Sequence, residues 1–232
     1  MQAARSTLAG LALVLGVAAV PPAGLTARQV VARSLAARGG AARFAAVRTY
    51  HFRGQLRLAR GPVGIEVWGE VRPARIRIEL ALPQGRLVQA WDGRRAWQLA
   101  PGARAAASLS GAAAKQLQDQ ALNGVDLIAA GGAQAALAGE GSLGGRRYVA
   151  VRFTLATGDS FTQFFDTRTW LAFHELYPGG VESISDYRRV DGLLLPFRFA
   201  SGPAGQPGTP LVRSEMDLNA RIAPSRFEPP AS

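Results

Sequence analysis

The two histidines, His51 and His174, are the first candidates for metal binding or catalysis, because the chain has no cysteine. The lack of cysteine excludes thiolate metal sites, cysteine nucleophiles and disulfides. Each histidine falls in a predicted strand, without a second ligand-type residue at the spacing that metal sites use. We therefore interpret both as surface or edge residues and predict no metal site.

Two other patterns could also carry chemistry. Residues 139–144 (GEGSLG) match the glycine pattern of dinucleotide-binding loops, but a strand from Tyr148 follows them, so a phosphate would meet no helix N-terminus. Glu66 and Glu70 share one strand face as a close carboxylate pair, and salt bridges to nearby arginines explain them more simply. No G-x-S-x-G elbow occurs. We predict no catalytic residues and no cofactor, with a hydrolase as the remote alternative.

The residues from 145 to 199 indicate an antiparallel meander. They are rich in valine, phenylalanine, threonine and tyrosine, and their apolar positions alternate between turns such as Asp191-Gly192. Earlier runs at 50–58, 63–70 and 75–82 alternate in the same way, and residues 89–99 form a hairpin around Asp92-Gly93.

Helices are predicted over three shorter stretches. Thr26 and Gln29 form a capping box for a helix over 27–38, which Gly39-Gly40 ends. A helical turn over 41–47 follows, and the alanine-rich stretch 105–122 is a third helix. Residues 224–230 are expected to be an irregular tail.

The pattern predicts a mainly β (α+β) fold. It is an unclosed antiparallel β-barrel, a curved sheet of about eleven strands with helices covering the concave face. Such a sheet carries more apolar area than two short helices can cover, which favours an apolar ligand cavity. The alternative is an ordinary core packed dry against the helices. The predicted cavity residues are Phe52, Leu56, Val67, Ile76, Ile78, Leu80, Trp91, Trp97, Phe153, Phe173 and Leu195.

The N-terminus predicts export. Arg5 precedes the uncharged apolar run 8–20, and small residues at 17–19 suit a cleavage site. We expect residues 1–19 to be a cleaved signal peptide, 20–232 to be a single domain, and the mature protein to be periplasmic. An uncleaved N-terminal anchor is the alternative.

The formal net charge of +11 comes mainly from arginines spread along the strands, as at Arg53, Arg57, Arg75 and Arg77. Such a surface favours an anionic membrane surface as a partner. Export argues against nucleic acid. We expect a monomer.

The order of these features resembles the LolA/LolB-like superfamily of outer-membrane lipoprotein-sorting proteins, over nearly all of the mature chain. The residues that carry the resemblance are Gly39-Gly40, Trp91-Asp92-Gly93 to Trp97, Asp186-Tyr187-Arg188, Asp191-Gly192 to Pro196, and Asn219 to Phe227-Glu228-Pro229. The resemblance implies a helix-lidded half-barrel that carries a lipid or lipoprotein acyl chain through the periplasm. It also implies the alternative of an envelope sensor or scaffold that uses the same fold to contact an envelope protein.

Overall fold

A computed structural model describes residues 24–126 and 133–230, so the predicted signal peptide lies outside the described residues. These ranges contain three α-helices, α1 (Ala27–Ala37), α2 (Ala41–Ala45) and α3 (Gly111–Asn123). The strands are β1 (Thr49–Leu58), β2 (Gly61–Glu70), β3 (Arg75–Leu82), β4 (Gly85–Trp91), β5 (Ala96–Leu99), β6 (Ala107–Leu109), β7 (Gln134–Leu143), β8 (Arg146–Thr154), β9 (Ser160–Asp166), β10 (Ala172–Tyr177), β11 (Gly180–Val190), β12 (Leu193–Gly202) and β13 (Thr209–Leu218). Among the described residues, no helix is long and apolar enough to span a membrane.

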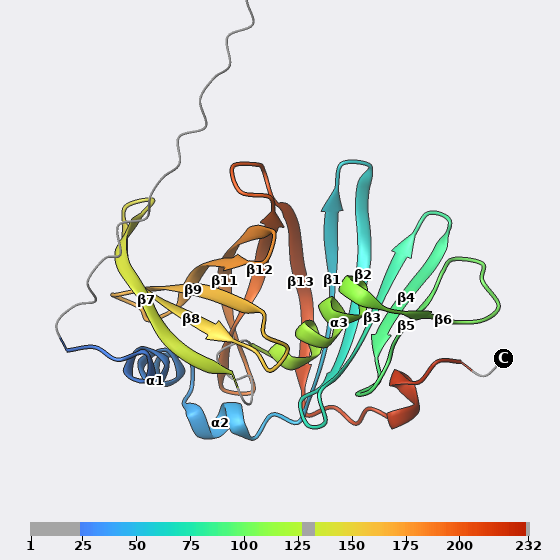
Figure 1. The fold of residues 1–232 in the computed structure, drawn as a ribbon, viewed down its shortest axis with the longest axis horizontal. Coiled ribbons are helices and arrows are strands. Elements are labelled where there is room, and N and C mark those ends of the chain that lie inside the picture. The colour runs from blue at the N-terminus through green and yellow to red at the C-terminus, as the bar shows by residue number, and fades with distance from the viewer. Residues whose placement is uncertain (1–23, 127–132, 231–232) are drawn as a thin grey trace, which may run out of the picture.

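All thirteen strands form one antiparallel sheet in the order β6-β5-β4-β3-β2-β1-β13-β12-β11-β10-β9-β8-β7. Consecutive strands pair with each other, apart from β6 and β7, and the first and last strands, β1 and β13, pair in the middle of the sheet. The ends, β6 and β7, are not paired with each other, so the barrel is unclosed (Figure 1). This confirms the predicted fold class, with two strands more than the approximate count of eleven.

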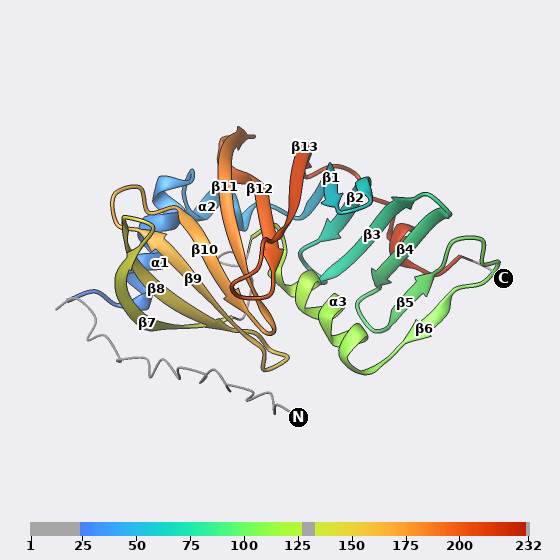
Figure 2. The same cartoon turned by 90° about the horizontal axis from the view of Figure 1, so that it is seen from above.

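The helical prediction for residues 105–122 was wrong at its start. Ala107–Leu109 pair with β5 as strand β6, and α3 begins only at Gly111, whose φ of 57° suits glycine. Backbone pairing to a sheet edge therefore overrides the helix propensity of alanine here. α3 then crosses the inside of the curved sheet, between the arm formed by β1–β6 and the arm formed by β7–β12 (Figure 2).

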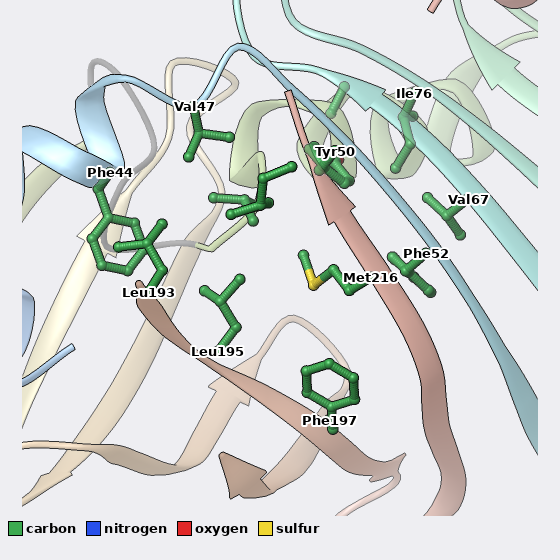
Figure 3. Packing of buried hydrophobic residues seen from close by; sticks show 13 residues of the cluster. Phe44, Val47, Tyr50, Phe52, Val67, Ile76, Leu193, Leu195, Phe197 and Met216 are labelled. Carbon is green, nitrogen blue, oxygen red and sulfur yellow. The ribbon is translucent and has the colours of Figure 1, made fainter. Parts of the chain in front are cut away.

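Two apolar clusters fill the inner face. The first joins β1, β2, β3, β12 and β13 to α2 and the end of α3, and Figure 3 shows Tyr50, Leu195 and Met216 converging within it. The second joins β8, β9 and β11 to α1, which packs against β7 and β8. The helices therefore cover the concave face, as predicted.

Trp97 lies on the outer face, in a third cluster with Val88 and Ala90. Its Nε1 donates a 2.8 Å hydrogen bond to the carbonyl oxygen of Phe227, in a 3₁₀ turn (Pro224–Phe227) within the predicted irregular tail. The expectation that Trp97 faces the concave side with Trp91 was wrong. Trp91 pairs with Ala96 and Trp97 with Ala90, so the hairpin turns the two tryptophans to opposite faces.

Replacing Trp97 with phenylalanine should therefore destabilise the protein, because the buried carbonyl of Phe227 loses its donor. We expect a loss of about 1–3 kcal/mol in the free energy of unfolding, measured by urea denaturation. Trp68→Phe on the same outer face is the control, since phenylalanine can keep the stacking of Trp68 on His51. Equal losses in the two variants would contradict a role for the indole hydrogen bond.

Candidate functional site

A cavity of about 560 Å³ lies between α3 and the inner face of β9–β12. Its volume falls within the range of roughly 300–1,000 Å³ that is usual for small-molecule sites. The α3 side of the wall is polar, and the sheet side adds two aromatic rings. Residues that define it include Lys115, Asp119, Phe161, Glu175, Tyr177 and Glu182.

None of the eleven predicted cavity residues lines this cavity. Seven of them belong to the inner apolar clusters or pack against them, namely Phe52, Val67, Ile76, Ile78, Trp91, Phe153 and Leu195. Leu56 and Leu80 are half-buried, and their pairing with Val63 and Ile65 places them on the same inner face.

Phe173 is the second residue that departs from the predicted face. It packs under the guanidinium of Arg146, 5.4 Å from the ring centre, instead of joining an inner cluster. The pairing of β9 with β10 shifts register between Ala172 and His174, and this bulge breaks the alternation of sides from which Phe173 was assigned to the inside. The prediction that it shares the concave face with Phe153 was therefore wrong.

The sheet wall of the cavity carries a row of polar side chains across four neighbouring strands. Gln163 pairs with Glu175, Glu175 with Glu182, and Glu182 with Ser201. Gln163 Nε2 donates a 2.8 Å hydrogen bond to Glu175 Oε2, and the Ser201 hydroxyl donates to Glu182 Oε1. Two carboxyl groups thus lie side by side in the interior of the barrel.

Burial and mutual repulsion change the proton affinity of this pair. Burial, with a further contribution from the charge of Glu182, raises the pKa of Glu175 to about 8. Burial also raises the pKa of Glu182, against the hydrogen bond from Ser201 and the charge of Arg213. Glu175 is therefore mostly protonated at neutral pH.

The α3 wall holds a small ionic network. Lys115 lies 3.3 Å from Asp119 and also pairs with Asp159, while the hydroxyl of Thr157 donates to Asp119. Burial raises the pKa of Asp119, whereas the hydrogen bond from Lys115 lowers that of Asp159. This network ties α3 to the turn between β8 and β9, beside the cavity.

A buried arginine joins the helices to the sheet. Arg38 is fully buried and lies between the rings of Phe44 and Tyr187. Its NH2 is 2.7 Å from Asp126 Oδ2, and its Nε donates to the carbonyl oxygen of Leu194. One side chain therefore connects the end of α1, the segment after α3 and strand β12.

The two histidines, the carboxylate pair and the glycine motif from the sequence analysis do not line this cavity. His51 contacts Glu66 at 2.8 Å on the outer face, and His174 packs against Phe164. Arg53 pairs with Glu66 at 2.9 Å and Arg75 with Glu70 at 3.3 Å, so the salt-bridge interpretation of these glutamates is confirmed. The glycine motif 139–144 runs through β7 into its turn, and strand β8 follows.

Comparisons with solved structures show which known fold this chain shares. No family model and no curated protein matches the sequence. A crystal structure of a LolA superfamily protein from Nitrosomonas europaea matches 88% of this chain and 98% of its own, at 13% identity and a TM-score of 0.61. The chain has a LolA-like fold.

Two further solved structures are similar to this LolA-like fold. A DUF1329 family protein from Desulfovibrio piger matches 87% of this chain and 97% of its own, at 10% identity and a TM-score of 0.59. A domain from Vibrio parahaemolyticus, provisionally described as an outer membrane lipoprotein-sorting protein, matches 86% of this chain and 95% of its own, at 9% identity and a TM-score of 0.56.

The sequence analysis did not predict the acidic pair, Glu175 and Glu182, inside this LolA-like fold. Glu182 could have been found, because it has the same strand parity as the buried Ile184. Glu175 could have been found as well, because it has the parity from which Phe173 was assigned to the inner face. Its position beside Glu182 depends on the register between β10 and β11, which alternation along one strand does not give.

Proposed function

We propose that this protein is an exported, periplasmic carrier that holds a lipid or lipoprotein acyl chain without catalysis. The observation that carries the proposal is the set of half-buried apolar side chains on the inner face of a LolA-like sheet, beside α3. The other side of α3 borders the cavity of about 560 Å³, whose polar wall could hold the polar end of such a ligand. The likeness to a domain described as a lipoprotein-sorting protein supports it.

An acyl chain would lie along the inner face where apolar side chains are incompletely covered. Leu56, Ile78, Leu80 and Trp91 are each half-buried there. The fully packed Phe52, Val67, Ile76, Phe153 and Leu195 would form the floor beneath it. Each methylene group removed from water contributes roughly 0.8 kcal/mol, so a chain of ordinary length has a large gross driving force.

The second candidate is an envelope sensor or scaffold that uses the same fold for protein contacts. The observation in its favour is that β6 and β7 end the sheet without pairing to each other. Such edges can accept a strand of a partner protein. The arginine-rich outer face suits an anionic membrane surface next to either function.

The carrier should take up fluorescent fatty acid, and a charge placed on the inner face should weaken this uptake. We expect Leu80→Arg to raise the dissociation constant at least about tenfold, because the guanidinium would lie in the acyl path. Ala81→Arg is the matched control, since Ala81 is the next residue of β3 and is exposed on the opposite face.

Organic extraction of protein purified from its exported form gives an independent test. Lipid recovered at about one molecule per protein supports the carrier. Protein that contains no lipid and also takes up no fluorescent fatty acid refutes the carrier and favours the scaffold.

A further inference from the structure

The cavity is acidic although the protein is strongly basic. Four carboxyl groups line it, Asp119, Asp159, Glu175 and Glu182, against one cation, Lys115. Lys115 already pairs with Asp119 and Asp159. In the described part of the chain, no cation forms a salt bridge with Glu175 or Glu182. The charge of Arg213 still acts on Glu182, and Glu175 is neutral at pH 7 because it keeps its proton.

Three buried amide oxygens in or next to the cavity wall have no hydrogen-bond partner, and the buried Nε of Arg213 is a donor that also has none. Gln163 is 3% exposed, and its Oε1 has no hydrogen-bond partner, while its Nε2 is held by Glu175. Two further amide oxygens on the α3 wall, Gln120 Oε1 and Asn123 Oδ1, are also buried and have no hydrogen-bond partner. Buried acceptors without donors are rare in folded proteins, and a ligand that brings donors would satisfy them.

The nearby arginine does not supply these donors. Arg213 lies between the rings of Phe52 and Phe199, at 4.4 and 4.6 Å, and its NH1 donates to the carbonyl oxygen of Pro196. Within residues 24–126 and 133–230, no group of three His, Cys, Asp or Glu side chains is placed to hold a metal ion.

We infer that the ligand of the proposed carrier bears a protonated amine, an ammonium group that Glu175 and Glu182 hold while its acyl chain lies along the inner face. The inference rests on the proposed function. An ammonium group has three donors and no acceptor, which matches a wall of carboxyl and amide oxygens. Gln163 and Ser201 each occupy one oxygen of their glutamate, leaving the second oxygen of each carboxyl group to accept from the ligand.

Binding of an ammonium group should release a proton. The pKa of Glu175 is about 8 in the empty protein, raised by burial and by the charges of Glu182 and Asp126, against the hydrogen bond from Gln163. Lys115 and Asp119 face the same cavity from α3, and Arg213 acts on Glu182 from β13. A positive charge at Glu175 favours the carboxylate, so Glu175 would lose its proton as the amine arrives.

Three probes of equal chain length test the inference by isothermal titration calorimetry at pH 7: decylammonium, decanol and decanoate. We expect decylammonium to bind at least about tenfold more tightly than the other two. Titrations in buffers of different ionisation enthalpy should show proton release with decylammonium and none with decanol.

Variants assign the effect to the two glutamates. Glu175→Gln and Glu182→Gln should each reduce the preference for decylammonium to within about twofold, and Glu175→Gln should abolish proton release. Glu215→Gln, at an exposed glutamate paired with Arg53 on the outer face, is the matched control and should keep the preference. Circular dichroism establishes that each variant is folded, and either glutamate variant alone suffices for the test.

The failures are distinguishable. Equal binding of all three probes, or tighter binding of decanoate, would overturn the ammonium inference and leave the acyl carrier standing. Binding of none of the probes would refute the proposed function itself.

Discussion

Glu175→Gln is expected to make the protein more stable than the wild type at pH 8. Burial raises the pKa of Glu175 from its ordinary value of 4.5 to about 8, so the folded state keeps a proton that the unfolded chain releases. Between these pH values the contribution of Glu175 to stability falls by about 1.4 kcal/mol per pH unit as pH rises, and this fall stops above pH 8. Glutamine mimics the neutral acid and has no proton to lose. Its advantage should reach the order of 4 kcal/mol at pH 8 and vanish near pH 4.

Urea denaturation at a series of pH values measures this difference. Glu66→Gln is the control of opposite sign, because hydrogen bonds from His51 and Arg53 lower the pKa of Glu66 against its burial. Glu66 contributes stability above its ordinary pKa and loses it as pH falls, so its glutamine variant should be the less stable one at neutral pH. A Glu175→Gln variant whose stability runs parallel to the wild type from pH 5 to 8 would contradict a protonated Glu175.

Arg38→Met is expected to destabilise the protein by about 3–5 kcal/mol. Methionine has a similar length and can fill the space between Phe44 and Tyr187, but it cannot form the ion pair with Asp126 or donate to the carbonyl oxygen of Leu194. Removing one member of a buried ion pair is costly because the other charge stays out of water. Thermal and urea unfolding would measure the loss.

Arg33→Met in the same helix is the control. Arg33 also lies over an aromatic ring, with its guanidinium carbon 4.7 Å from the centre of Trp170, but it is exposed. We expect it to cost less than about 1 kcal/mol. If Arg38→Met is equally mild, the buried ion pair has no net effect on stability.

The fold could be predicted because alternation along each strand depends only on local residue order. Helix α1 began at Ala27 as expected, because Thr26 and Gln29 form the predicted capping box. The candidate site was harder, since it depends on register between strands. Trp97 and Phe173 were misplaced by a hairpin and a bulge, two features that act through the partner strand. Glu175 and Glu182 meet only because β10 and β11 align them.

The pairing of β1 with β13 has a consequence for how the chain folds. The backbone nitrogen of Arg48 donates to Asn219 Oδ1, and these residues are 171 positions apart. The central seam of the sheet therefore cannot close until almost every other strand has been synthesised, whereas the hairpins on both sides can form from neighbouring residues. Contacts of such long sequence separation slow folding, so the hairpins on both sides should form before β1 pairs with β13. Until then β1 would be an unprotected edge, which is the point at which a chaperone would be most useful.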